Sequence, residues 1–307
     1  MRDAFAQEMT RLAAERTDVT LLSGDIGNRM FERYKQVAPE RFFNCGIAEA
    51  NMMSLAAGMA LSGLRPVIYT ITPFTTTRCL EQIRVGVAYH QAPVVIVGTG
   101  SGLSYAELGP THHSLEDMAI LRTLPGLNVL APADSTELVA QLREALDAPH
   151  PTYMRIGKKG EPPLHGESAQ LGIGKANLLR DGSDLLVLGV GPILGEALQA
   201  SEAVAAEGFS VAVASLGGVK PLDTAFLEAM AERFPRWLSL EEHGINGGLG
   251  SALLEWLGDR DGPAIRLKRL GVPDTFLHEL GNQNYTRRQL SLDAAGLAQT
   301  FQRALVS

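Results

Sequence analysis

Short, continuously apolar runs alternate with stretches of helical periodicity along most of the chain. Residues 94–98, Val-Val-Ile-Val-Gly, form one such run, and residues 3–16 place Phe5, Met9 and Leu12 at helical spacing. A strand that is apolar throughout is typical of a parallel sheet covered by helices on both faces. The alternation of strand and helix therefore predicts an α/β fold with mostly parallel sheets.

The same pattern predicts the order of the elements in each half of the chain. In the first half, the expected strands cover residues 19–25, 41–44, 65–72, 94–98 and 127–132, with helices over 3–16, about 50–61, 80–88 and from 135 onward. In the second half, strands are expected over residues 184–191, 211–216, 237–241 and 264–267, with helices at about 193–207 and after a glycine turn at 242–250.

The alternation lapses at residues 157–166, which are polar and rich in glycine and proline. Such a stretch is typical of a linker or surface excursion. We therefore predict two α/β domains, residues 1–166 and 167–307, each with a mostly parallel sheet flanked by helices.

Composition narrows the class of protein. The chain has 307 residues, 45% hydrophobic and 20% charged, which suits about two globular domains, and its net charge of -7 argues against nucleic-acid binding. Cys45 and Cys79 are too few for a disulfide framework, and Cys45 is expected to be a small buried residue. A secretory signal and a long apolar span are not found in the sequence, so a cytoplasmic location is expected.

One carboxylate, Glu49, stands at the start of an apolar helix rich in small residues. By itself it could be a first-turn acid that interacts with the helix dipole and contributes less than about 1 kcal/mol. Its surroundings indicate more: Gly-Ile-Ala-Glu at 46–49 leads into the helix, Phe74 follows the next strand, and Gly-Pro-Thr-His-His occupies 109–113.

This order of motifs resembles the pyrimidine-binding half of transketolase-like thiamine diphosphate enzymes. The family includes transketolase, deoxyxylulose-phosphate synthase and the β subunits of 2-oxo acid dehydrogenases. The second half, with Glu-Glu-His at 241–243 and Gly-Gly-Leu-Gly at 247–250, resembles the C-terminal domain of the same family. The resemblance covers nearly the whole chain.

The resemblance implies roles for three residues toward thiamine diphosphate. Glu49 would be the carboxylate on the far ring nitrogen of the aminopyrimidine, which promotes the imino tautomer that activates the cofactor. Phe74, otherwise a core aromatic, would stack on the aminopyrimidine. Ile47, otherwise a core residue, would support the bent conformation of the cofactor.

The resemblance also implies substrate contacts. His112, and His113 as a further candidate, would stabilise the oxygen of a ketol or acyl adduct. Leu108 replaces the aspartate with which sugar-phosphate transketolases bind an acceptor hydroxyl. Gly100 aligns with a phosphate-contacting histidine and Lys158 with an arginine, so these departures favour an acceptor other than the ordinary pentose phosphates.

The family's diphosphate-binding half, with its Gly-Asp-Gly motif and metal-binding asparagine, has no counterpart in the sequence; Gly-Asp-Ile-Gly-Asn at 24–28 has the wrong spacing. We therefore expect no metal ligands in this chain. Mg²⁺ and the diphosphate would be held by a separate N-terminal subunit, in a two-plus-two heterotetramer.

The leading hypothesis is a transferase subunit that moves a two-carbon unit from a ketose, or from pyruvate after decarboxylation, to an aldehyde or ketone acceptor. Two alternatives stay open. His-His-Ser at 112–114 also suits a 2-oxo acid dehydrogenase β subunit, and a degenerate homologue could serve as a noncatalytic partner. The glycines at 247–250 could hold a phosphate at a helix N-terminus.

Overall fold

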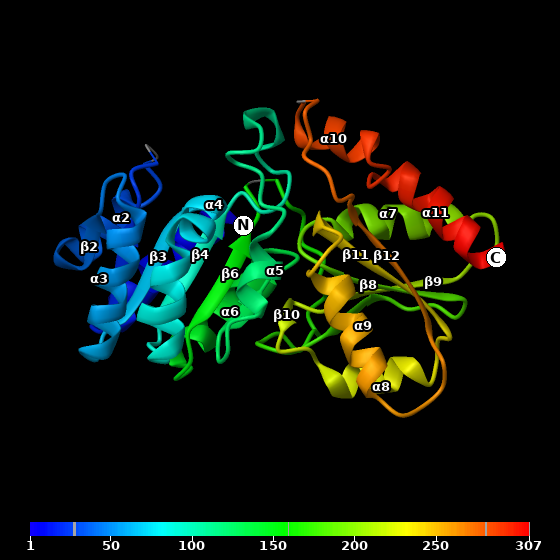
Figure 1. The fold of residues 1–307 in the computed structure, drawn as a ribbon, viewed down its shortest axis with the longest axis horizontal. Coiled ribbons are helices and arrows are strands. Elements are labelled where there is room, and N and C mark those ends of the chain that lie inside the picture. Colours follow the sequence, from blue (N-terminus) through cyan, green and yellow to red (C-terminus); the bar gives the residue numbers. More distant parts are fainter. Residues whose placement is uncertain (27–28, 159, 280, 307) are drawn as a thin grey trace.

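The computed structural model describes residues 1–26, 29–158, 160–279 and 281–306, and it has two α/β units side by side (Figure 1). Gly27 and Asn28 of the Gly-Asp-Ile-Gly-Asn motif, and Lys159 of the polar stretch at 157–166, lie outside the described residues. Each unit has a mostly parallel sheet flanked by helices. The predicted α/β fold is therefore confirmed.

The first sheet is parallel except at one edge, where β10 runs antiparallel to β5. In spatial order its described strands are β10 (Gly218–Lys220), β5 (Asn128–Leu130), β6 (Thr152–Ile156), β4 (Val95–Thr99), β3 (Arg65–Ile71), β1 (Val19–Ser23) and β2 (Phe42–Asn44).

Strand β6 was not predicted from the sequence, although it lies in the interior of the sheet and is buried along its whole length. Thr152 and Arg155 interrupt its apolar pattern. Arg155 is nevertheless buried, because its Nε lies 3.3 Å from Oδ2 of Asp117 and its Nη2 donates to the carbonyl of Ser114.

Helices cover both faces of the first sheet. One face packs against α1 (Arg2–Glu15), α2 (Glu32–Val37) and α6 (Ser135–Asp147), and the other against α3 (Glu49–Leu61), the π-helix η3 (Gln82–Tyr89) and α5 (Asp117–Arg122). Short helical turns complete this unit: η1 (Pro39–Arg41), α4 (Thr72–Thr75), η2 (Thr77–Cys79) and η4 (Ala106–Leu108). The segment predicted as a helix over 80–88 is thus a π-helix, and Asp134 rather than Ser135 caps α6.

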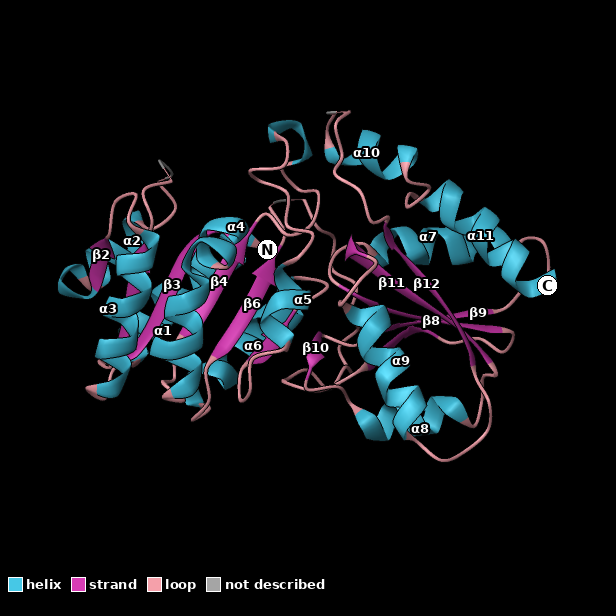
Figure 2. Ribbon diagram, viewed as in Figure 1, coloured by secondary structure: helices cyan, strands magenta, loops and turns pink. Residues whose placement is uncertain are grey.

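The second sheet is also parallel except for its edge strand β7. Its strand order is β12 (Arg266–Val272), β11 (Arg236–Gly244), β8 (Leu185–Val190), β9 (Val211–Ser215) and β7 (Asn177–Arg180). Figure 2 shows α8 (Thr224–Ala231) and α9 (Leu249–Asp259) on one side, and α7 (Leu194–Ala205) and α11 (Ala294–Val306), preceded by α10 (Gln283–Gln289), on the other.

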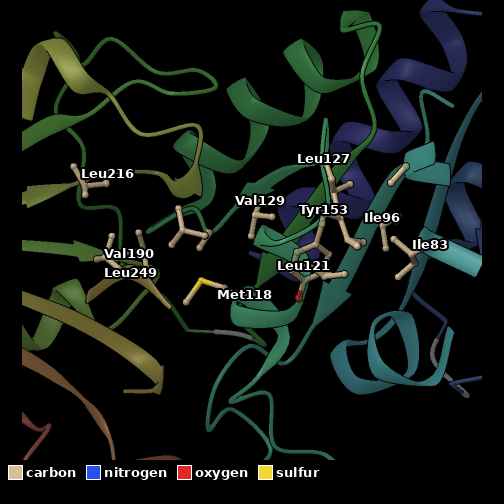
Figure 3. Packing of buried hydrophobic residues seen from close by; sticks show 14 of the residues in the cluster. Ile83, Ile96, Met118, Leu121, Leu127, Val129, Tyr153, Val190, Leu216 and Leu249 are labelled. Atoms are coloured by element: carbon tan, nitrogen blue, oxygen red, sulfur yellow. The ribbon is translucent and has the colours of Figure 1, made fainter. Parts of the chain in front are cut away.

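One hydrophobic cluster extends through both units (Figure 3). In that view Met118 of α5 lies between Leu121 and Leu249, the latter from α9. The edge strand β10 strengthens this connection, because it follows residue 166 in the chain but pairs with the first sheet. The two units therefore share a core and a strand, and the domain boundary near Gly166 stays a prediction.

Among the described helices, none combines the length and the apolar character that crossing a membrane requires.

Candidate active site

Glu49 begins α3 directly after the loop that leaves β2, at the carboxyl ends of parallel strands. Ligands of open α/β sheets bind at this edge. The Glu49 side chain is only 5% exposed, and its Oε1 lies 3.1 Å from Nη1 of Arg78. Because a buried carboxylate needs a partner, this cation compensates a charge that α3 alone would leave in a largely dry position.

Phe74 lies on α4, which contacts α3, and its ring is half-buried. The guanidinium of Arg78 covers the ring, with Cζ 4.0 Å from the ring centroid. Arg78 was not predicted from the sequence. Its spacing of four residues from Phe74, which places two side chains on the same side of a helical segment, was the available signal.

The neighbouring thiol of Cys79 is buried. Burial raises the pKa of Cys79 to about 12, and the charge of Glu49 acts in the same direction. The thiol is therefore protonated near neutral pH and is a packing group rather than a nucleophile. Burial also raises the pKa of Cys45, which is half-buried rather than fully buried.

His112 comes from a different segment, the loop between η4 and α5, and its ring meets Phe74 edge to face at a centroid distance of 5.4 Å. Its Nδ1 lies 2.9 Å from Oγ1 of Thr111. Burial lowers the pKa of His112, and the neighbouring His113 and Arg78 act in the same direction. The imidazole is therefore largely neutral near pH 7, able to accept a proton or donate a hydrogen bond.

His113 and Ile47 lie in different surroundings. His113 is buried, and its Nε2 lies 3.1 Å from the carbonyl oxygen of Ala106, which ties the loop to η4. This contact favours a structural part for His113, and its catalytic role stays a prediction. Ile47 is 83% exposed, so it is not a core residue, and its contact with a cofactor also stays a prediction.

Lys158 and Gly100 lie near each other around Tyr105, a residue that was not predicted from the sequence. The Lys158 ammonium lies 4.3 Å from the centroid of the Tyr105 ring and 3.4 Å from Oε1 of Glu107. A Cβ at Gly100 would lie 2.2 Å from the same ring, and the backbone there has a φ of +82°. Tyr105 thus fills the space above Gly100, and no larger residue could stand there without moving it.

Tyr105 also connects this group to His112, with ring centroids 6.1 Å apart. Leu108 ends η4 close by in the chain and is 49% exposed. Lys158 and Glu107 line a polar cleft of about 440 Å³ between the two units, and Arg287 of α10 lines its other side. The structure therefore places Phe74, His112, Tyr105 and Lys158 in one continuous row that starts at Glu49.

The glycines before α9 accommodate a protein carboxylate instead of a phosphate. Glu241 Oε2 accepts a hydrogen bond from the backbone N–H of Leu249 at 2.7 Å, and its Oε1 accepts one from that of Gly250 at 2.9 Å. A Cβ at Gly248 would lie 2.0 Å from Oε2. The positive end of α9 is therefore already neutralised from within the chain.

A buried carboxylate beside an aromatic face, with a neutral imidazole at its edge, suits a flat heteroaromatic ring that has a basic nitrogen. Within the ranges that the structure describes, no group of three or more His, Cys, Asp or Glu residues could hold a metal ion.

Comparison with known proteins agrees with this geometry. Residues 1–161 match the model of the transketolase pyrimidine-binding domain, and residues 174–291 match that of the transketolase C-terminal domain. The chain therefore belongs to the transketolase family, as the motif order predicted.

The relatives specify the architecture further. One of the separate subunits of the apulose-4-phosphate transketolase of Phocaeicola vulgatus is 33% identical over 97% of this chain and 95% of its own length. A solved structure described as a split-gene transketolase, inactive β4 tetramer, is 30% identical, with a TM-score of 0.89 over 99% of this chain and 97% of that one.

A longer relative is the 1-deoxy-D-xylulose-5-phosphate synthase of Syntrophotalea carbinolica. It is 37% identical over 96% of this chain, which spans 45% of that protein. The chain thus has the two-domain composition of one subunit of a split transketolase, and it corresponds to about half of a full-length synthase.

Proposed function

We propose that this chain is the pyrimidine-binding subunit of a split, thiamine diphosphate-dependent transferase. It would transfer a two-carbon ketol or acyl unit to an aldehyde or ketone acceptor. The observation that carries the proposal is the buried carboxylate of Glu49 at the start of α3, joined through Arg78 to the ring of Phe74, which in turn contacts His112. A chain that served only as a scaffold would have no physical need to bury this carboxylate beside that ring.

Thiamine diphosphate, when bound, supplies the carbanion chemistry that amino-acid side chains cannot provide. Glu49 would hold a proton at the ring nitrogen of the aminopyrimidine, and burial keeps water from competing for it. Phe74 would orient the ring. His112, with Nδ1 engaged by Thr111, presents Nε2 to the substrate oxygen and would donate a hydrogen bond as negative charge develops there.

The diphosphate and Mg²⁺ would be held by a separate N-terminal subunit, in a two-plus-two heterotetramer located in the cytoplasm. The name of the Phocaeicola relative, which is one subunit of its transketolase, supports a separate partner. The stoichiometry rests on the habit of symmetric oligomers in such enzymes.

The substrate-facing residues support a specialised acceptor. Leu108 offers no hydrogen-bond acceptor to a sugar hydroxyl, and Tyr105 replaces polar contacts above Gly100 with an aromatic face. Lys158 remains as a phosphate-binding cation, although Glu107 offsets part of its charge. We therefore propose an acceptor other than the ordinary pentose phosphates, and equal activity with xylulose 5-phosphate and ribose 5-phosphate as with other pairs would contradict this.

The identity with deoxyxylulose-phosphate synthases supports a second candidate, acyl transfer from pyruvate. The two candidates differ in one product, because only pyruvate releases carbon dioxide on transfer. Carbon dioxide release by the assembled enzyme, measured with pyruvate and then with a ketose donor, decides between them.

The main test replaces Glu49 in the complex of this chain with its diphosphate-binding partner. We expect Glu49→Gln to fold and assemble normally but to lower turnover by about 10²-fold or more, because the amide cannot hold the proton. Glu8→Gln is the matched control: Glu8 is also a buried, ion-paired carboxylate, but it lies on the opposite face of the sheet, and its loss should leave turnover unchanged. Full turnover by Glu49→Gln would remove Glu49 from the mechanism.

A further inference from the structure

Arg78 makes two contacts that, under the proposed function, belong to the cofactor. Its Nη1 lies 3.1 Å from Oε1 of Glu49, and its guanidinium covers the ring of Phe74 at 4.0 Å. These are the carboxylate that would bind the ring nitrogen of an aminopyrimidine and the aromatic ring on which that aminopyrimidine would stack.

The guanidinium and a protonated aminopyrimidine share the relevant chemistry. Both are flat, delocalised cations that present an N–H donor in their plane and a π face above it. A site that suits one suits the other, and one carboxylate oxygen cannot accept a short, in-plane hydrogen bond from both groups at once.

We propose that Arg78 competes with the aminopyrimidine of thiamine diphosphate for Glu49 and Phe74, so that its guanidinium must swing out before the ring can bind. This inference rests on the proposed function. The exposure of the two partners supports the direction of movement: the Arg78 side chain is 45% exposed, whereas that of Glu49 is 5% exposed. The arginine can turn toward solvent without disturbing the core, and the glutamate cannot.

The arrangement also explains why an arginine is useful at this place. A buried carboxylate without a cation would carry a large desolvation cost, and it would draw water or a neighbouring segment into the site. Arg78 lies on η2, directly after α4, so the same short segment supplies both the aromatic ring and the cation that covers it. The guanidinium thus keeps the binding surface in shape and is exchanged for the cofactor ring.

A competitor inside the site weakens the apparent affinity by the fraction of molecules in which it is displaced. A half-exposed ion pair and a cation–π contact are each modest, so their removal should tighten binding about 5- to 30-fold. Arg78→Gln removes the charge while retaining a polar side chain. Arg78→Lys retains the charge but not the flat fork, and it should give a smaller gain.

The experiment uses the complex of this chain with its diphosphate-binding partner and measures thiamine diphosphate binding by titration calorimetry in the presence of Mg²⁺, without substrate. Circular dichroism and the melting temperature establish that each variant is folded. Arg233→Gln is a matched control, because Arg233 is 40% exposed, pairs with Asp181 and covers the ring of Phe234, but belongs to the second unit.

Tighter binding by about 5- to 30-fold in Arg78→Gln, with Arg233→Gln unchanged, supports the competition. Unchanged or weaker binding in Arg78→Gln overturns it, since Arg78 would then be neutral or part of the bound site. If Arg78→Gln does not fold, unchanged or weaker binding in Arg78→Lys overturns it equally. A wild-type complex that binds no thiamine diphosphate overturns the proposed function itself, and this result is distinct from the others.

Discussion

Asp134 joins the segment around residue 165 to the first unit, and its two oxygens have separate partners. Oδ1 accepts hydrogen bonds from the backbone N–H groups of Thr136 at 3.0 Å and Glu137 at 2.9 Å, which caps α6. Oδ2 accepts from the backbone N–H groups of Leu164 at 2.7 Å and His165 at 2.9 Å, and lies 3.0 Å from Nδ1 of His165. The side chain is fully buried.

This division makes Asp134→Asn informative. The amide oxygen can keep the helix cap, but the amide nitrogen then faces two backbone N–H donors. Hydrogen bonds to a charged group contribute about 1.5 to 3 kcal/mol each, so losing both should lower the free energy of unfolding by about 3 to 5 kcal/mol. That is a large part of the stability of a typical domain, which is about 5 to 15 kcal/mol.

Urea unfolding followed by far-ultraviolet circular dichroism measures the loss. Asp223→Asn is the matched control: Asp223 caps α8 through Oδ1 and holds the backbone N–H of Ala176 through Oδ2, but it is only partly buried. It should cost about 1 to 2 kcal/mol. Equal losses in the two variants, or a loss below about 1 kcal/mol for Asp134→Asn, would refute the argument that burial makes this junction stable.

Two further predictions concern pH and substrate. Burial opposes protonation of His165, but the hydrogen bond with Asp134 and the charge of Glu137 raise its pKa overall, so its contribution to stability is complete below about pH 6.5 and is lost as the pH rises through the folded-state value. Urea midpoints should therefore fall from about pH 6 to about pH 9 in the wild type, roughly in proportion to His165 deprotonation, and less in His165→Gln. Lys158→Met should raise KM about 10-fold or more for a phosphorylated acceptor and leave that for an unphosphorylated acceptor unchanged, because only the former uses the ammonium; equal KM changes for both would exclude a phosphate-binding role.

Most of the fold could be predicted because buried parallel strands are continuously apolar, as in β4 and β8. The pattern failed where a buried polar residue depends on a distant partner. Arg155 breaks the apolar run of β6, and only the folded chain brings Asp117 to it. The strand β10 has three residues and joins a sheet from the other half of the chain, which local periodicity cannot reveal.

The site divides in the same way. The motif order predicted Glu49, Phe74 and His112, and the structure brings the ring of Phe74 to both of the other two through Arg78 and a direct edge contact. Arg78 and Tyr105 were missed because their importance comes from what they cover rather than from their spacing. Gly100 was interpreted as a lost polar contact, whereas the structure shows that Tyr105 occupies that space.

The place of β10 in the first sheet has a consequence for synthesis on the ribosome. The last other strand of that sheet, β6, ends at Ile156, but the edge is completed only by residues 218–220. At about 5 to 20 residues per second, translation of the intervening segment takes roughly 3 to 13 s. During that interval β5 is an open edge, able to pair with another nascent chain. Slow codons just after β6 would lengthen this interval and should increase aggregation of newly made chains.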